Sequence, residues 1–140
     1  MGGLTARYLA DKSALARIRK PEVAARLVPL IENGEVATCA IVELEVLYSA
    51  RSHSDLVRTA QRRRQAYEWV EISEATFERA LEVQEMLARA GHHRVPIPDL
   101  IIASAAESAG LVVLHYDTDF DAISRVTGQI CEWIVPRGTV

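Results

Sequence analysis

Short apolar segments alternate with longer amphipathic segments along most of the chain. Strand-like runs lie at about 7–11, 36–39, 69–72 and 111–114, and residues with helical spacing fill the intervals between them. This alternation is typical of a parallel sheet, because each strand is followed by a helix that carries the chain back to the edge where the strand began. The pattern therefore predicts an α/β fold with helices covering the sheet.

Cap and turn residues predict where several helices begin and end. Pro21 suits the first turn of a helix that stops at the Asn-Gly pair 33–34, because this pair readily adopts the left-handed conformation. A further helix is expected over 54–67. Ser73 is expected to cap a long helix that Gly91 ends.

Helical spacing also predicts which faces of two helices point inward. In the helix after the second strand, the apolar stripe consists of Ile41, Leu44, Leu47 and Tyr48. Glu43 lies at the edge of this stripe and is therefore expected to reach inward. In the long helix after Ser73, the expected apolar face consists of Phe77, Ala80, Leu81, Leu87 and Ala88.

Four carboxylates are expected to gather at one edge of the sheet: Asp11, Glu43, Asp99 and Asp117. Asp11 closes the apolar run 8–10, and Asp117 follows the run 111–114. Both should lie at the carboxyl ends of buried strands, where open α/β sheets place their ligands. Glu43 and Asp99 belong to helices that would cover the sheet.

Asp99 is an acid near the start of a helix that is otherwise apolar or small on nearly every face. Such an acid is either an ordinary helix-terminus residue or a functional acid held at a cleft. The three other carboxylates favour the functional interpretation, since like charges gathered within a few ångströms raise one another's pKa unless a cation neutralises them. Ligands that offer only oxygen select a hard cation, so we expect Mg²⁺ or Mn²⁺.

A metal centre of this kind predicts phosphodiester hydrolysis, because the ion acidifies water, polarises a phosphoryl oxygen and neutralises charge at phosphorus. Asp11 and Asp99 are the strongest candidates for holding the ion. Asp117 is expected to ligate directly or through water, and Glu43 to ligate or to orient the attacking water.

Ser13 and Asp119 are auxiliary candidates for the same site. The Ser13 hydroxyl, two residues after Asp11, either donates a hydrogen bond to a carboxylate or phosphate or simply caps a helix. Asp119 is an additional acid directly after Asp117 and Thr118.

The composition is that of an ordinary globular protein, and we expect one domain over residues 1–140. No apolar run reaches the ~18 residues that a membrane span needs, and the first seven residues do not have the pattern of an export signal, so a cytoplasmic protein is expected. Cys39 and Cys131 are interpreted as small buried hydrophobic residues in a reducing compartment.

Net charge argues against binding nucleic acid through bulk positive charge. The chain has 16 basic and 19 acidic residues, a net charge of −3. The basic residues are nevertheless clustered, and either cluster is a candidate phosphate-binding surface or a solvated helix face. The first cluster consists of Lys12, Arg17, Arg19 and Lys20, and the second of Arg58, Arg62, Arg63 and Arg64.

Four segments in order along the chain resemble the successive motifs of PIN domains, in particular the VapC-type toxins of bacterial toxin–antitoxin pairs. They are Tyr8-Leu-Ala-Asp-Lys-Ser-Ala-Leu15, Glu43-Leu44 with Tyr48-Ser-Ala50, Pro98-Asp-Leu-Ile-Ile-Ala103 and His115-Tyr-Asp-Thr-Asp-Phe120. Each motif alone is weak, and the order and spacing of all four make the match specific. The acidic positions of the family fall on Asp11, Glu43, Asp99 and Asp117.

The resemblance implies a three-layer α/β/α fold with a five-stranded parallel sheet, a homodimer, and a Mg²⁺- or Mn²⁺-dependent endoribonuclease that arrests translation. It also implies a cognate VapB-like antitoxin, whose tail wraps the toxin and often places a basic side chain in the acidic site. One departure concerns His115, because many relatives have a small hydroxyl residue there. Any contact through such a hydroxyl is therefore in doubt.

Two other functions remain open. One is a metal-independent ribonuclease that uses a pair of imidazoles for acid–base catalysis, although His92 and His93 are interpreted as exposed loop residues. The other is a non-catalytic PIN-like module that binds RNA or a protein.

Overall fold

A computed structural model describes residues 5–140 of the chain. Residues 1–4, part of the segment interpreted above as lacking an export signal, lie outside the described residues. Within residues 5–140, no helix is both long enough and apolar enough to cross a membrane.

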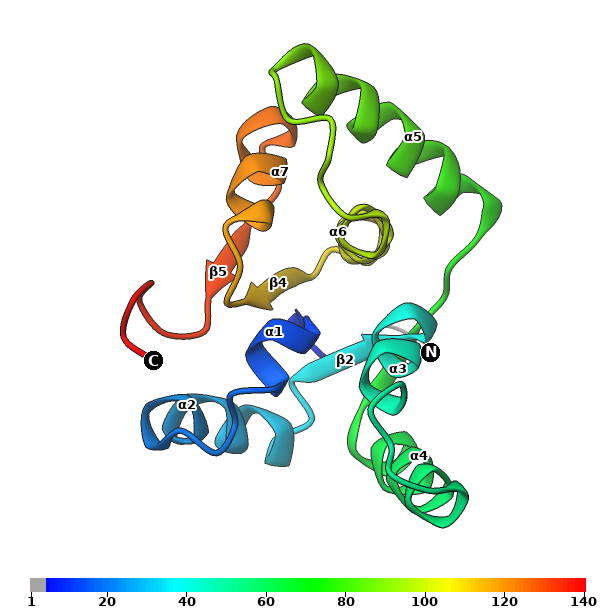
Figure 1. The fold of residues 1–140 in the computed structure, drawn as a ribbon, viewed down its shortest axis with the longest axis vertical. Coiled ribbons are helices and arrows are strands. Elements are labelled where there is room, and N and C mark those ends of the chain that lie inside the picture. The colour runs from blue at the N-terminus through cyan, green and yellow to red at the C-terminus, as the bar shows by residue number, and fades with distance from the viewer. Residues whose placement is uncertain (1–4) are drawn as a thin grey trace.

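In the described part of the chain, five parallel strands form one sheet in the order β3-β2-β1-β4-β5 (Figure 1). The strands are β1 (Tyr8–Ala10), β2 (Val36–Cys39), β3 (Glu68–Val70), β4 (Val112–His115) and β5 (Cys131–Trp133). The predicted α/β fold with a five-stranded parallel sheet is confirmed. The residue pattern located the first four strands to within two residues, whereas β5 has three residues and no alternating pattern.

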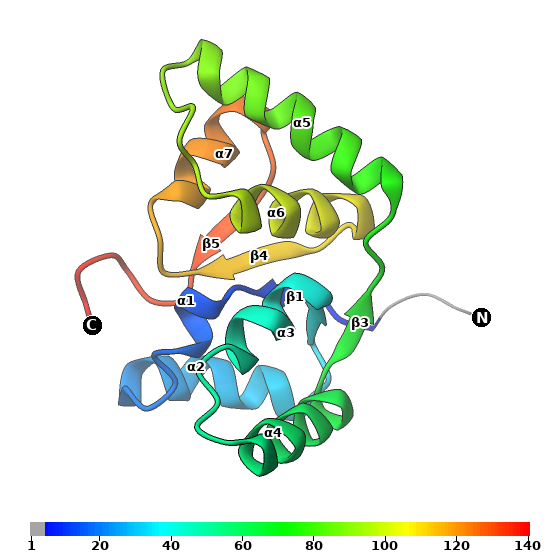
Figure 2. The ribbon, with the colours of Figure 1, turned by 45° about the vertical axis from the view of Figure 1, so that its right-hand side comes forward.

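Over residues 5–140, seven helices cover the sheet and form two outer layers around it. They are α1 (Lys12–Leu15), α2 (Pro21–Glu32), α3 (Ala40–Leu47), α4 (His53–Ala66), α5 (Glu74–Arg89), α6 (Ile97–Ala109) and α7 (Asp119–Thr127). In both ribbon views α5, α6 and α7 lie on one side of the sheet and α2 and α4 on the other (Figures 1 and 2). Pro21 begins α2 and Ser73 precedes α5, as predicted.

The core has two parts, one on each face of the sheet. On one face Leu9 and Val113 pack with Ile102 of α6 and Phe120 of α7, all fully buried. On the other face Ala10 and Leu114 belong to a cluster with Val23 and Leu27 of α2. Cys39 is buried as predicted, while Cys131 is only half-buried, and both are free thiols.

The predicted apolar face of α3 is only partly right. Ile41 packs against the core, and Glu43 reaches inward as expected. Val42 and Glu43 are buried, whereas Leu44 is 66% exposed and Tyr48 is 89% exposed. Apolar residues occur on every side of this helix, so spacing alone does not identify the face that packs against β2 and α6.

The predicted face of α5 is only partly right. Ala80 and Leu87 are buried as expected, and Val83 completes the buried face. Phe77 and Leu81 remain exposed beside α6. The apolar residues of α5 form a stripe wider than the surface that α6 and α7 cover.

The strand order places a topological switch point between β1 and β4. From β1 the chain adds β2 and then β3 on one side, and after β4 it adds β5 on the other. Connections that leave in opposite directions open a crevice at the carboxyl ends of the two strands. Asp11 follows β1 directly, and its N–H donates to the carbonyl of Leu114 in β4 at 2.9 Å. The crevice is therefore where the predicted acids should meet.

Candidate active site

Three aspartates meet at the switch point. Asp99 lies in the first turn of α6, Asp117 lies between β4 and α7, and Asp119 begins α7. Each offers one carboxylate oxygen, and these oxygens all lie within 4.8 Å of one another. The Asp117 carboxylate is oriented by the N–H of Asp119, which donates to Oδ1 at 2.9 Å. The structure thus brings Asp99 and Asp117 together and adds Asp119, one of the auxiliary candidates.

Asp11 lies beside this cluster and is held by the turn that follows β1. It is only 4% exposed, caps α1, and accepts a hydrogen bond at Oδ2 from the N–H of Ser13 at 2.9 Å. Ser13 is therefore not the N-cap. Its hydroxyl oxygen accepts a hydrogen bond from the N–H of Tyr116 at 2.8 Å, which ties α1 to the segment that carries Asp117.

Asp99 has the most perturbed environment of the cluster. Burial, followed by the negative charges of Asp11 and Asp117, raises the pKa of Asp99 to about 8. Its Oδ2 is buried without a hydrogen-bond partner among the described residues. Burial and the charge of Asp117 also raise the pKa of Asp119. A helix cap would not leave a buried oxygen unpaired, so the capping interpretation of Asp99 does not explain this geometry.

Glu43 does not join the aspartates, contrary to the sequence prediction. Both carboxylate oxygens accept hydrogen bonds from Arg63 of α4, from Nε at 2.7 Å and from Nη2 at 2.8 Å, and the Thr38 hydroxyl donates to Oε2. The two side chains are 7% and 11% exposed. Glu43 therefore forms a buried bidentate ion pair that joins α3 to α4.

Glu45 is the carboxylate of α3 that the sequence analysis missed. Burial, followed by the negative charge of Asp11, raises its pKa, and the charge of Lys12 opposes this. Its Oε1 is buried and has no hydrogen-bond partner among residues 5–140. Residues two apart point to different sides of a helix. Because Glu43 faces Arg63, Glu45 lies on the side of α3 that faces the aspartates. The sequence signal for this was the pair of acids two residues apart, since only one of them can face the site.

His115 is a structural residue beside the site. It is fully buried, and its ring packs against Phe120 and Trp133 with centroids 5.1 and 5.0 Å away. Burial lowers its pKa, and Nδ1 accepts a hydrogen bond from the N–H of Asp117 at 3.2 Å. A buried imidazole that supports Asp117 is unsuited to act as one member of a solvent-accessible catalytic pair.

The two predicted basic clusters have different environments. In the first, Arg17 donates to the Ser13 carbonyl at 2.7 Å and lies over the ring of Tyr116, 4.4 Å from its centroid, while the charge of Lys12 acts on Glu45. In the second, Arg63 forms an ion pair with Glu43, and the guanidinium of Arg64 lies over the ring of Trp69. The second cluster is therefore not a continuous phosphate-binding face.

Comparison with known proteins agrees with this geometry. A model of the PIN domain matches residues 8–126, a span that contains all the acids described above. Ribonuclease VapC21 of Mycobacterium tuberculosis is 48% identical over 137 residues, which cover 97% of this chain and 99% of the relative. Ribonuclease VapC51 of the same species is 46% identical over 134 residues, covering 96% and 97%. The chain belongs to the PIN-domain family and to its VapC-type group.

Solved structures confirm the fold of this PIN domain. The DNA-bound VapBC complex from Salmonella typhimurium contains a chain that matches with a TM-score of 0.73 at 20% identity, covering 93% of this chain and 99% of that chain. VapBC-5 from Mycobacterium tuberculosis matches with a TM-score of 0.61 at 26% identity, covering 92% and 97%. The resemblance inferred from the sequence motifs is thus confirmed.

The environment of Asp99 predicts a specific pH dependence of stability without metal. In the unfolded chain Asp99 titrates near its usual pKa of about 3.9, and in the folded protein near 8. Between these values the folded state holds a proton that the unfolded state has lost, so stability falls as pH rises through this window. In chelator, the free energy of unfolding from urea titrations should fall by about 1–3 kcal/mol more between pH 5 and 8 in the wild type than in Asp99→Asn.

Mg²⁺ added at pH 8 should restore stability to the wild type and much less to Asp99→Asn, because the ion replaces the proton as the neutralising charge. Equal pH dependence in the two proteins would show that Asp99 is not perturbed in the way described.

Proposed function

We propose that residues 1–140 act as a single PIN domain that is a Mg²⁺- or Mn²⁺-dependent endoribonuclease toxin. It cleaves cellular RNA, inhibits translation, and is neutralised by a VapB-like antitoxin. The observation that carries the proposal is the aspartate cluster at the switch point, in particular the buried, unpaired oxygen of Asp99. The similarity to proteins named as VapC ribonucleases supports the choice of RNA as substrate. Cytoplasmic action follows, since cellular RNA is found there.

The donor set fits a hard divalent cation. Every candidate ligand atom is a carboxylate oxygen, and three such oxygens lie within 4.8 Å of one another. Burial, followed by the negative charges of Asp11 and Asp117, raises the pKa of Asp99 to about 8, so its charged form is favoured only when a cation is nearby. Asp99 and Asp117 would hold the ion, with Asp119 and Asp11 as direct or water-mediated ligands. When bound, the ion supplies acidified water and neutralises charge at the phosphorus.

The other residues of the site orient these ligands and move a proton. The N–H groups of Ser13 and Asp119 fix the carboxylates of Asp11 and Asp117. We assign to Glu45 the role first expected of Glu43. Its partly desolvated carboxylate, with Oε1 unpaired, is suited to orient the attacking water and accept its proton.

An antitoxin is proposed because several neighbouring structures are described as toxin–antitoxin complexes, among them VapBC complexes. The excess negative charge of the site favours inhibition by a cation, and a guanidinium can pair with two carboxylate oxygens at once. A basic antitoxin side chain would thereby compete with the metal ion.

We also propose a homodimer. Phe77 and Leu81 of α5 and Ile97 of α6 line an exposed apolar groove, and a contiguous apolar surface of this kind is typical of an interface. A monomeric mass in light scattering of the antitoxin-free protein would contradict this proposal.

The central test is cleavage of total cellular RNA by antitoxin-free protein, with Mg²⁺ or Mn²⁺ and with excess chelator. Discrete cuts should require the metal and should be reduced to background by Asp99→Asn, because this change removes a ligand while preserving side-chain volume. Circular dichroism and urea titration establish that the variant is folded. Cuts that persist in chelator would support the metal-independent histidine mechanism instead. RNA binding without any cleavage would support a non-catalytic module.

Variants of the two glutamates of α3 should have different effects in the same assay. Glu45→Gln should lower kcat by about 10²–10⁴-fold with little change in stability, since it removes a proton acceptor. Glu43→Gln should destabilise the fold, because it leaves the buried guanidinium of Arg63 without its carboxylate, while the folded protein continues to cleave. Glu82→Gln, on the exposed face of α5, is the matched control and should change neither property. A loss of cleavage in folded Glu43→Gln, with Glu45→Gln active, would reverse the assignment.

A further inference from the structure

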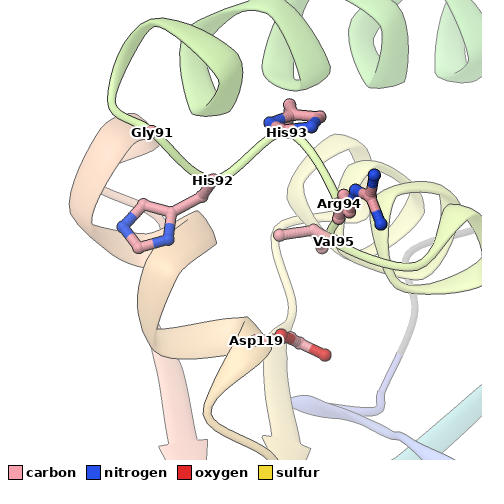
Figure 3. Close-up of a pocket in the computed structure, with 6 residues that line it drawn as sticks. All are labelled: Gly91, His92, His93, Arg94, Val95 and Asp119. Atoms are coloured by element: carbon pink, nitrogen blue, oxygen red, sulfur yellow. The ribbon is translucent and has the colours of Figure 1, made fainter.

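A second cavity lies directly beside the aspartate cluster. It has a volume of about 300 Å³ and is lined by Gly91, His92, His93, Arg94, Val95 and Asp119 (Figure 3). The first five residues form the loop between α5 and α6, and Asp119 lies across the cavity at the start of α7. Asp119 also belongs to the aspartate cluster, so the cavity and the candidate active site share a wall.

The loop presents hydrogen-bond donors that the rest of the described chain does not use. His92, His93 and Arg94 are exposed, and none of them forms a salt bridge within residues 5–140. Within residues 5–140, the backbone N–H groups of His93, Arg94 and Val95 also donate no hydrogen bond. An imidazole has at least one N–H in either protonation state, and a guanidinium has five. Such a set suits an anionic or hydrogen-bond-accepting ligand.

The charge of the active site makes such donors necessary for an RNA substrate. The active site is surrounded by five acids, and one divalent ion offsets only part of their charge. These acids are Asp11, Asp99, Asp117, Asp119 and Glu45. The phosphates on either side of the scissile bond would therefore be repelled unless nearby cations compensate. Lys12 and Arg17 provide cations on the α1 side, where α1 follows β1. In Figure 2 the loop between α5 and α6 lies on the opposite side of the carboxyl ends of β1 and β4 from α1.

We propose that the cavity formed by Gly91–Val95 and Asp119 binds the nucleotide next to the scissile phosphate of a single-stranded RNA. Arg94 pairs with its phosphate, and the imidazole of His93, the neighbouring residue, contacts its base, while the His92 ring points away from Asp119 (Figure 3). The volume is at the lower end of the ~300–1,000 Å³ typical of small-ligand pockets, which suits one nucleotide. Guanidinium groups bind phosphate bidentately, and unpaired bases stack on imidazole rings. This inference rests on the proposed ribonuclease function and adds a subsite to it.

The test compares two arginines that differ in whether they line the cavity. Steady-state cleavage of an oligoribonucleotide containing a site mapped with the wild type gives KM and kcat. Arg94→Gln should raise KM by about tenfold and leave kcat within about twofold, because the contact is to a flanking nucleotide. Arg89→Gln is the control: Arg89 is exposed at the end of α5 and pairs with Glu85, so the same charge is lost outside the cavity. Its KM should stay within about twofold of the wild type.

A binding measurement makes the inference independent of turnover. Fluorescence anisotropy measures binding of the same oligonucleotide to Asp99→Asn protein in Mg²⁺. The double variant Asp99→Asn/Arg94→Gln should bind more weakly, and its slope of log K against log salt concentration should be smaller by about 0.7. His93→Gln should weaken binding to the oligonucleotide more than binding to one with an abasic flanking nucleotide. Equal effects of Arg89→Gln and Arg94→Gln would show that only overall charge matters and would overturn the subsite. An unchanged KM in Arg94→Gln would also overturn it. If the wild type fails to cleave any RNA, the ribonuclease proposal fails. Anisotropy with a single-stranded oligoribonucleotide of mixed sequence, comparing wild type, Arg94→Gln and Arg89→Gln, then decides whether the cavity binds RNA.

Discussion

Carboxylates at the switch point repel one another, and the fold holds them together despite this repulsion. Asp99 is 7% exposed and has a pKa raised to about 8, so its charged form is unfavourable unless a cation is present. The parallel sheet makes the crowding unavoidable, because β1 and β4 end side by side and α6 brings Asp99 over them. Fixed hydrogen bonds hold the acids in place: the N–H of Ser13 donates to the Asp11 carboxylate, and the N–H of Asp117 donates to Nδ1 of His115. We interpret this arrangement as a metal centre assembled before the metal binds.

The helix α3 carries two acids with different roles: Glu43 is structural, and Glu45 is proposed to act in the reaction. Glu43 is neutralised by Arg63 and fixes α4 to α3, and an ion pair this buried is costly to break on one side only. Glu45, two residues later, faces Asp11 with no fixed partner for its buried oxygen. A fixed α3 determines where Glu45 lies, so the buried pair supports the active site indirectly. This explains why two acids of similar sequence context have different environments.

The sequence predicted the fold and most of the acids because their positions depend on local pattern. Asp11 and Asp117 follow recognisable buried strands, and strand ends in a parallel sheet converge. Glu43 points inward, as its place at the edge of the apolar stripe predicted, but it pairs with Arg63 and not with the aspartates. Leu44 and Tyr48 made the wrong side appear apolar, and the partner that decides the matter, Arg63, lies 20 residues away in the chain. The cavity beside Asp119 was equally unpredictable, since the loop at His92–Arg94 meets α7 only through the packing of α5.

The central claim is that the aspartates form a divalent metal centre, and its most direct test is crystallographic. Crystals grown with Mn²⁺ should show an anomalous peak, at the manganese absorption edge, about 2.0–2.3 Å from carboxylate oxygens of Asp99 and Asp117. Glu43 should remain paired with Arg63 and lie away from the peak. Absence of a peak at saturating Mn²⁺, or a peak on Glu43 in place of the aspartates, would contradict the account.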